Sequence, residues 1–132
     1  MVRRLDTILV LVSTLSFFSA PAFGLVAIDS LGWKAEVSFD SAKIPLAKIH
    51  TWKVEVKDQS SQLAPCAPNS VTGDMPAHRH GLPTRPVARA ADKSGVIWVE
   101  GLKFQMPGEW EVLISCADTV GNNHEFKFSF VL

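Results

Sequence analysis

Glu-Phe-Lys-Phe-Ser-Phe, residues 125–130, places a phenylalanine at every second position and a polar side chain between them. Successive side chains of a strand point to opposite faces of a sheet, so this alternation indicates a strand with one face on a core and one in water. The same period of two recurs in three stretches that begin at Trp33, Trp52 and Trp110. The sequence therefore predicts at least four half-buried β-strands.

The remaining segments complete an all-β pattern. The more uniformly apolar stretch 95–104 suits a central strand, shorter strands are expected around 69–72 and 86–90, and 25–30 is expected to be a loose lead-in. Turn-forming residues separate these stretches, and no apolar stripe keeps helical spacing for more than two turns. About seven short antiparallel strands predict an immunoglobulin-like β-sandwich. A small β-barrel is the alternative.

The N-terminus is typical of a secretory signal peptide. Arg3 and Arg4 precede an apolar run over 7–18, and small residues follow this run. The run is shorter than the roughly 20 apolar residues that a spanning helix needs, so an uncleaved anchor is the less favoured alternative. We therefore expect a signal peptide over 1–24, export across the inner membrane to the periplasm, and a single mature domain over 25–132 without stable membrane insertion.

The charge balance and the motifs exclude some classes of function. The whole chain carries 13 Lys and Arg against 13 Asp and Glu, and the expected cleavage leaves 11 against 12. Without an excess of positive charge, nucleic acid is not an expected partner. A hydrolase needs a nucleophile, a base and an orienting group, and the chain has no Gly-x-Ser-x-Gly or comparable signature. We therefore do not expect an enzyme.

The two cysteines of the chain, Cys66 and Cys116, have three interpretations. In an oxidising compartment, an even pair indicates a disulfide first. A bridge that closes a loop of about 50 residues would stabilise the fold by roughly 4 kcal/mol on the chain-entropy model. Unpaired structural thiols, and thiols that bind metal or do redox chemistry, are the alternatives.

The segment 75–86 holds the candidate site. His78 and His80 follow Met75 by three and five residues, and the prolines and the glycine of the segment exclude a central strand and predict a rigid loop. Thioether sulfur favours Cu(I), and imidazole suits both oxidation states of copper. Copper, as Cu(I), is therefore the predicted metal, because a three-histidine zinc site would leave the methionines unexplained. A surface loop with two histidines and no metal is the alternative.

Two further residues are candidates to complete this site. Met106 lies in a Met-Pro-Gly turn between two predicted strands, and His50 immediately precedes the strand of Trp52. The alternatives are a turn methionine that caps the core and a structural histidine at a strand start. His124 is expected at a strand end, without a metal. A shared site requires that the loop of residues 75–86 pack on the turn at Met106.

Three blocks of this chain resemble the YtkA-like domains, which are grouped with FixH-type proteins. The blocks are His-Thr-Trp at 50–52, Met-Pro-Ala-His-Arg-His-Gly-Leu-Pro-Thr-Arg-Pro at 75–86, and Val-Glu-Gly-Leu-Lys-Phe-Gln-Met-Pro-Gly-Glu-Trp at 99–110. The resemblance covers about residues 45–132. It implies an exported or membrane-tethered immunoglobulin-like domain with a role in copper handling or haem-copper oxidase maturation. A copper-accepting or oxidase-type membrane protein is the partner that this role implies.

The chain departs from the family pattern just before the Met-Pro loop. The family has small and β-branched residues there, whereas 63–70 carries two prolines and Cys66. A cross-sheet disulfide to Cys116 would explain this departure, so Cys66 is not treated as a metal ligand of the family.

Taken together, the residues and the resemblance predict an exported copper-binding accessory protein, either a metal carrier or an oxidase-maturation factor. Met75, His78 and His80 would supply the loop ligands, with Met106 and His50 as completions. The alternative is a protein-interaction module without metal that serves a membrane complex, because methionine is common on adaptable binding surfaces. The sequence does not indicate an oligomeric state.

Overall fold

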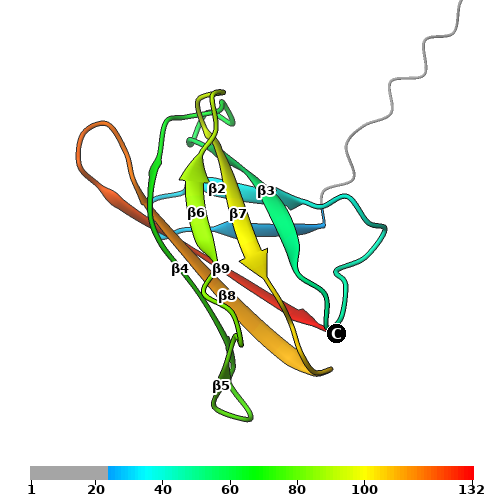
Figure 1. Cartoon of the computed structure of the whole chain (residues 1–132). Coiled ribbons are helices and arrows are strands. Elements are labelled where there is room, and N and C mark those ends of the chain that lie inside the picture. The colour runs from blue at the N-terminus through cyan, green and yellow to red at the C-terminus, as the bar shows by residue number, and fades with distance from the viewer. Residues whose placement is uncertain (1–23) are drawn as a thin grey trace, which may run out of the picture.

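A computed structural model describes residues 24–132, so the expected signal peptide lies, apart from Gly24, outside the described residues. Within this range the chain forms nine strands in two antiparallel sheets that pack on one another (Figure 1). The first sheet has the order β1-β2-β3-β7-β6 and the second the order β5-β4-β8-β9. The strands are β1 (Leu25–Ile28), β2 (Lys34–Ser38), β3 (His50–Lys57), β4 (Ala67–Met75), β5 (His80–Gly81), β6 (Val87–Ala90), β7 (Val96–Leu102), β8 (Glu109–Ala117) and β9 (Asn123–Val131).

The predicted all-β sandwich is confirmed, with nine strands in place of about seven. The two separate sheets do not correspond to the barrel alternative. The short strands expected around 69–72 and 86–90 are present as parts of β4 and β6, and β7 is an interior strand between β3 and β6. Residues 24–132 contain no helix that could cross a membrane.

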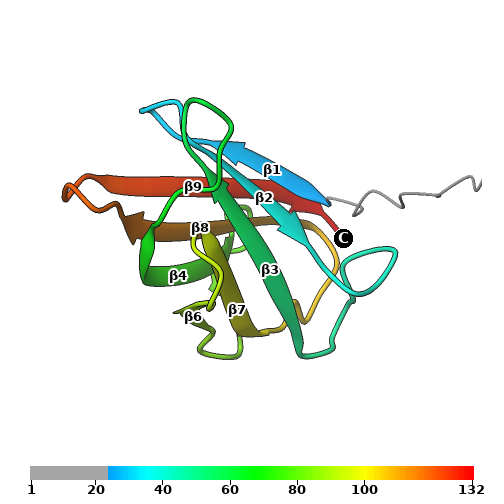
Figure 2. The same ribbon diagram turned by 90° about the horizontal axis from the view of Figure 1, so that it is seen from above.

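The prediction of a loose lead-in over 25–30 is wrong. Residues 25–28 form β1, which pairs with β2 in the register Leu25↔Val37 to Ile28↔Lys34. Figure 2 shows β1 beside β9, where the two sheets approach each other. The stretch Leu-Val-Ala-Ile has no polar alternation to mark it as a strand, so its backbone partner decides its conformation.

The core lies between the sheets and consists of the apolar positions of the period-two stretches. Each of these side chains points inward because the polar residues next to it take the outer face of the sheet. The largest fully buried side chains include Trp52, Val54, Phe104, Trp110, Ile114, Phe126 and Phe128. Residues 24–132 therefore form a closed hydrophobic core of their own.

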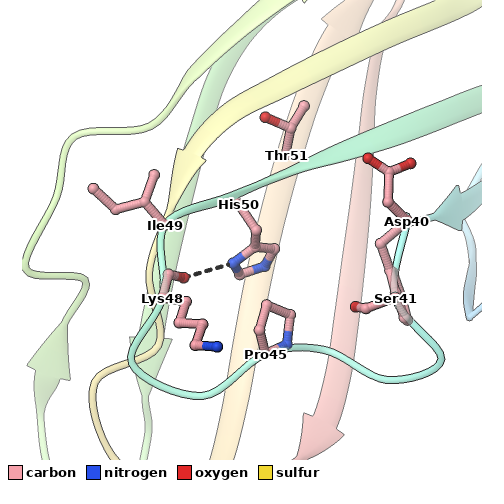
Figure 3. A pocket seen from close by; sticks show the side chains of 8 residues that line it. Asp40, Ser41, Pro45, Lys48, Ile49, His50 and Thr51 are labelled. Carbon is pink, nitrogen blue, oxygen red and sulfur yellow. Dashed lines mark hydrogen bonds between the residues drawn. The ribbon is translucent and has the colours of Figure 1, made fainter.

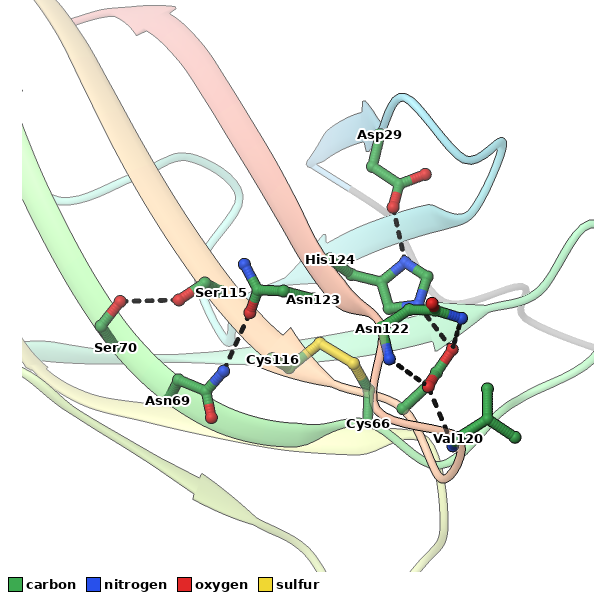
Figure 4. Close-up of a disulfide and its surroundings, with 11 residues drawn as sticks. Asp29, Cys66, Asn69, Ser70, Ser115, Cys116, Val120, Asn122, Asn123 and His124 are labelled. Carbon is green, nitrogen blue, oxygen red and sulfur yellow. Dashed lines mark hydrogen bonds and ion pairs between the residues drawn. A yellow bond between two sulfur atoms is a disulfide. The ribbon is translucent and has the colours of Figure 1, made fainter.

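The structure pairs Cys66 with Cys116 in a disulfide (Figure 4). The bridge joins β8 to the segment just before β4, and β4 is the neighbour of β8 in the same sheet. It therefore braces one sheet, which corrects the expectation of a bridge across the two sheets. The register of β4 on β8 shifts between Pro68 and Ser70, because a proline has no N–H for the ladder.

A buried charged cluster, Asp29–His124–Asp118, closes the same end of the sandwich. His124 Nδ1 lies 2.6 Å from Asp29 Oδ2, and its Nε2 lies 3.1 Å from Asp118 Oδ2 (Figure 4). Its ring stacks on Trp33 with a centroid separation of 4.0 Å. An ionised carboxylate can only accept hydrogen bonds, so both contacts are satisfied when both ring nitrogens carry protons. The cluster ties the β1–β2 turn to the β8–β9 turn.

Replacing His124 by alanine should destabilise the fold strongly. The Asp29 side chain is only 3% exposed, so the substitution leaves a buried carboxylate with only the backbone N–H groups of Leu31 and Trp33 as partners. We expect the free energy of unfolding to drop by about 3–5 kcal/mol in urea denaturation followed by tryptophan fluorescence. The exposed neighbour substitution Glu125→Gln is the control, and a drop of less than about 1 kcal/mol in His124→Ala would contradict the assignment.

Acid should destabilise the protein through Asp118. Burial favours the neutral form of the Asp118 carboxyl and so raises its pKa. Hydrogen bonds to the ionised form outweigh this effect and lower the pKa of Asp118 from 3.8 to about 2. The donors are His124, the Asn122 side chain and the backbone N–H groups of Asn122 and Val120. A depressed pKa stabilises the fold above the unfolded-state value, and this contribution disappears as the pH falls through the folded-state value. We therefore expect the difference in melting temperature between the wild type and Asp118→Asn to disappear as the pH falls from 3.8 to about 2. A constant difference would refute the prediction.

Candidate functional site

The predicted ligands lie at the opposite end of the sandwich from the disulfide. Here β4 and β7 end while β3 and β8 begin, as the pairs His50↔Leu102 and Asp74↔Glu111 show (Figure 1). The Gln105 side-chain amide donates to the carbonyl of Gly81 at 3.3 Å. The base of the histidine segment therefore contacts Gln105, the residue that precedes the Met-Pro-Gly turn.

The segment predicted as a loop forms a tight hairpin. Met75 ends β4 and pairs with His80 of β5, and Asp74 pairs with Gly81. The backbone N–H groups of His78 and Arg79 both donate to the carbonyl of Met75, at 3.1 and 2.9 Å. Arg79 has a φ of 51° in the left-handed region, which closes the turn. The hairpin therefore holds the backbone of both histidines in a defined position.

His78 and His80 lie at the tip of this hairpin, and both are exposed. Their ring centroids are 6.3 Å apart and their planes are inclined by 20°. A metal-bound imidazole nitrogen lies about 2 Å from the metal and about 1 Å from its own ring centroid, so two rings on one ion have centroids about 5 to 6 Å apart. Both side chains are at the surface, so each is free to change rotamer and turn a ring nitrogen toward a common ion.

Met75 is not a surface ligand in this structure. Its side chain is fully buried in the core as the last inward residue of β4. A Cβ placed on Gly108 would come within 2.7 Å of Met75 Cε, so the thioether end lies directly under the Met-Pro-Gly turn. The prediction placed Met75 among the ligands of the loop, whereas the structure buries its thioether in the core.

Met106 is the methionine of this end that reaches solvent, with 36% of its surface exposed. It lies in the turn between β7 and β8, and its carbonyl accepts a hydrogen bond from the Trp110 indole N–H at 3.0 Å. This bond holds the turn on the core and leaves the thioether of Met106 outside it.

His50 lies at the start of β3 and is directed to a different surface. Its Nδ1 donates to the carbonyl of Lys48 at 3.0 Å, and its ring packs 5.4 Å from Phe104. Burial lowers the pKa of His50, and the hydrogen bond to Lys48 opposes this only in part. Its Nε2 is buried and has no hydrogen-bond partner among the described residues.

The pocket beside His50, of about 510 Å³, is lined by residues between Phe39 and Thr51 (Figure 3). Neither His78 nor His80 contributes to this pocket. The structure therefore does not group His50 with the two histidines of the hairpin.

Among residues 24–132, no three His, Cys, Asp or Glu side chains are grouped so that they could hold a metal ion. Any third ligand of a metal site on the hairpin would therefore be a residue of another type. A thioether is the soft ligand that this end of the molecule offers.

The fold and this end of it define a class: a small two-sheet β-sandwich that presents paired histidines on a hairpin next to a methionine turn. The chain matches the profile of the YtkA-like family over residues 31–115, and it belongs to that family. The match extends from the β1–β2 turn into β8 and includes every predicted ligand. Comparisons with curated proteins and with solved structures gave no match.

Stability measurements should separate the two methionines. Truncation of a fully buried methionine leaves a cavity, so Met75→Ala should lower the free energy of unfolding by about 2–5 kcal/mol. Met106→Ala removes a partly exposed side chain, and we expect a loss below about 1 kcal/mol. Chemical denaturation of both variants is the measurement. Equal losses would show that the buried position of Met75 is not maintained in solution.

Proposed function

We propose that this YtkA-like protein is a periplasmic, non-enzymatic copper-binding accessory protein. His78 and His80 hold Cu(I), and Met106 supplies a thioether from the neighbouring turn. The observation that carries the proposal is the pair of exposed imidazoles, 6.3 Å apart, on a hairpin whose base is hydrogen-bonded to Gln105, the residue before the exposed Met106.

The chemistry of the donors favours this metal. Thioether sulfur and imidazole nitrogen together suit Cu(I), whereas hard cations require oxygen ligands. Met75 supports the hairpin from below, because its side chain fills the space under Gly108. It is also the cross-strand partner of His80, so its packing in the core helps to fix the position of His80 on the hairpin.

The exposure of the two histidines suits a carrier. Ligands of an acceptor protein can approach an ion at a hairpin tip before the ligands of this chain release it. A copper-accepting or oxidase-type membrane protein is the proposed partner. His50 has no place in this site, because it opens into the pocket of residues 39–51.

A protein-interaction module without metal is the second candidate function. The observation that favours it is the rigidity of the proline-rich segment after the hairpin. Thr84 Oγ1 donates to the carbonyl of Gly101 at 2.6 Å, which holds this segment against the end of β7. Such a surface is pre-organised for a protein partner, since little conformational entropy remains to be lost on binding.

A competition titration against a chromogenic Cu(I) chelator tests the proposal, with the chain that begins at Leu25 and a reductant that spares the disulfide. We expect one tightly bound Cu(I), with the affinity reduced at least about tenfold in His78→Ala/His80→Ala because two of the soft-metal ligands are lost. Met106→Ala should weaken binding by a smaller factor.

Two variants are matched controls. Arg79→Ala alters the same turn but keeps both imidazoles, and Met75→Leu keeps the core volume, so both should bind Cu(I) like the wild type. Equal binding by the wild type and the double histidine variant would exclude the copper site and leave the interaction module.

A further inference from the structure

An apolar hollow opens where the described chain begins. It has a volume of about 490 Å³, and its lining brings together β1, the β2–β3 loop and the end of β9. We call it the terminal hollow, defined by Leu25, Lys43, Leu46, Phe130, Val131 and Leu132. Two of its aliphatic residues are exposed to solvent, Leu46 by 45% and Val131 by 76%.

The β2–β3 loop is held so that Leu46 stays at the surface. The next residue, Ala47, has a φ of 57°, which is unfavourable for a side chain with a Cβ. The Ala47 N–H donates to the carbonyl of Phe104 at 2.7 Å, and Leu46 forms a parallel bridge with Phe104. Backbone strain that the surrounding structure maintains is often found at binding sites.

The position of the hollow relates it to the N-terminal apolar run. Leu25 lines the hollow, and only residues 19–24 separate it from the apolar run over 7–18. Six residues span at most about 20 Å when extended. Figure 2 shows the start of β1, the β2–β3 loop and the C-terminal end together on one side of the molecule. While the run is in a bilayer, this side therefore lies within that distance of the membrane.

The charges around the hollow complement an anionic surface. The β2–β3 loop carries Lys43, which lines the hollow, and Lys48, which lines the pocket beside His50, against one acid, Asp40. Neither lysine takes part in an ion pair within the described part of the chain. Lysines close to exposed aliphatic side chains are the combination with which peripheral proteins bind anionic lipid.

We propose that the terminal hollow docks the domain on the surface of an anionic phospholipid bilayer. Leu46 and Val131 enter the boundary between headgroups and acyl chains, and Lys43 and Lys48 face the lipid phosphates. Because the β2–β3 loop is hydrogen-bonded to Phe104, two residues before Met106, docking places the Met-Pro-Gly turn near the bilayer. The proposal does not depend on copper binding.

Co-sedimentation with vesicles tests this docking, again with the chain that begins at Leu25. We expect binding to phosphatidylglycerol vesicles at low ionic strength, with less binding at high salt and to phosphatidylcholine vesicles. Two double variants should each lower the bound fraction at least about fivefold. Leu46→Ser/Val131→Ser removes the apolar insertion, and Lys43→Glu/Lys48→Glu removes the attraction to the lipid phosphates. All four side chains are exposed, so the fold should persist, and urea denaturation checks this.

The matched control is Val26→Ser/Ile28→Ser, which removes two aliphatic side chains that are 55% and 70% exposed on β1. This variant should bind vesicles like the wild type. The proposal is overturned if phosphatidylglycerol vesicles do not bind the wild type, or if the control loses as much binding as Leu46→Ser/Val131→Ser. A third outcome would also overturn the docking proposal. If the wild type binds no vesicles but self-associates, and Leu46→Ser/Val131→Ser abolishes this self-association, the hollow is an interface between copies of the chain.

Discussion

The packing of Phe104 between the two sheets is the contact on which the functional end of the molecule depends. Its ring lies 5.9 Å from Trp52 of the first sheet, and 5.2 Å and 5.1 Å from Trp110 and Phe130 of the second. Such tilted and edge-to-face pairs are favourable beyond the area they bury. The backbone of the same residue holds the β2–β3 loop through Leu46 and Ala47. One buried aromatic residue therefore positions the loop of the terminal hollow and the turn that carries the exposed methionine.

The two ends of the sandwich have different physical characters. One end carries the disulfide and the Asp29–His124–Asp118 cluster, which connect elements far apart in the chain. The other end carries the histidine hairpin and the Met-Pro-Gly turn, whose side chains reach solvent. The disulfide and the buried cluster thus hold one end of the sandwich, while the turns of the other end present side chains to solvent. Functional side chains on loops held by a rigid scaffold are a common arrangement.

The pattern of the sequence predicted most of the fold but only part of the candidate site. The period-two stretches all form strands, and the family resemblance is confirmed. The stretch of β1 was missed because Leu-Val-Ala-Ile has no alternation. Met75 was placed in a loop because Pro76 follows it, although a proline can follow the last residue of a strand. The buried cluster of His124 was also missed, since its carboxylates are 95 and 6 residues away along the chain.

The sequence by itself determined the alternating strands, the turns between them and the family, because these are properties of neighbouring residues. Only the tertiary structure decided which methionine reaches solvent and which histidines lie together. Met75 is buried because Gly108, more than thirty residues later, leaves room for its thioether. His50 is separated from His78 and His80 because its ring packs on Phe104 and opens into another pocket. Burial and proximity depend on contacts between distant segments, and local side-chain patterns contain no information about those contacts.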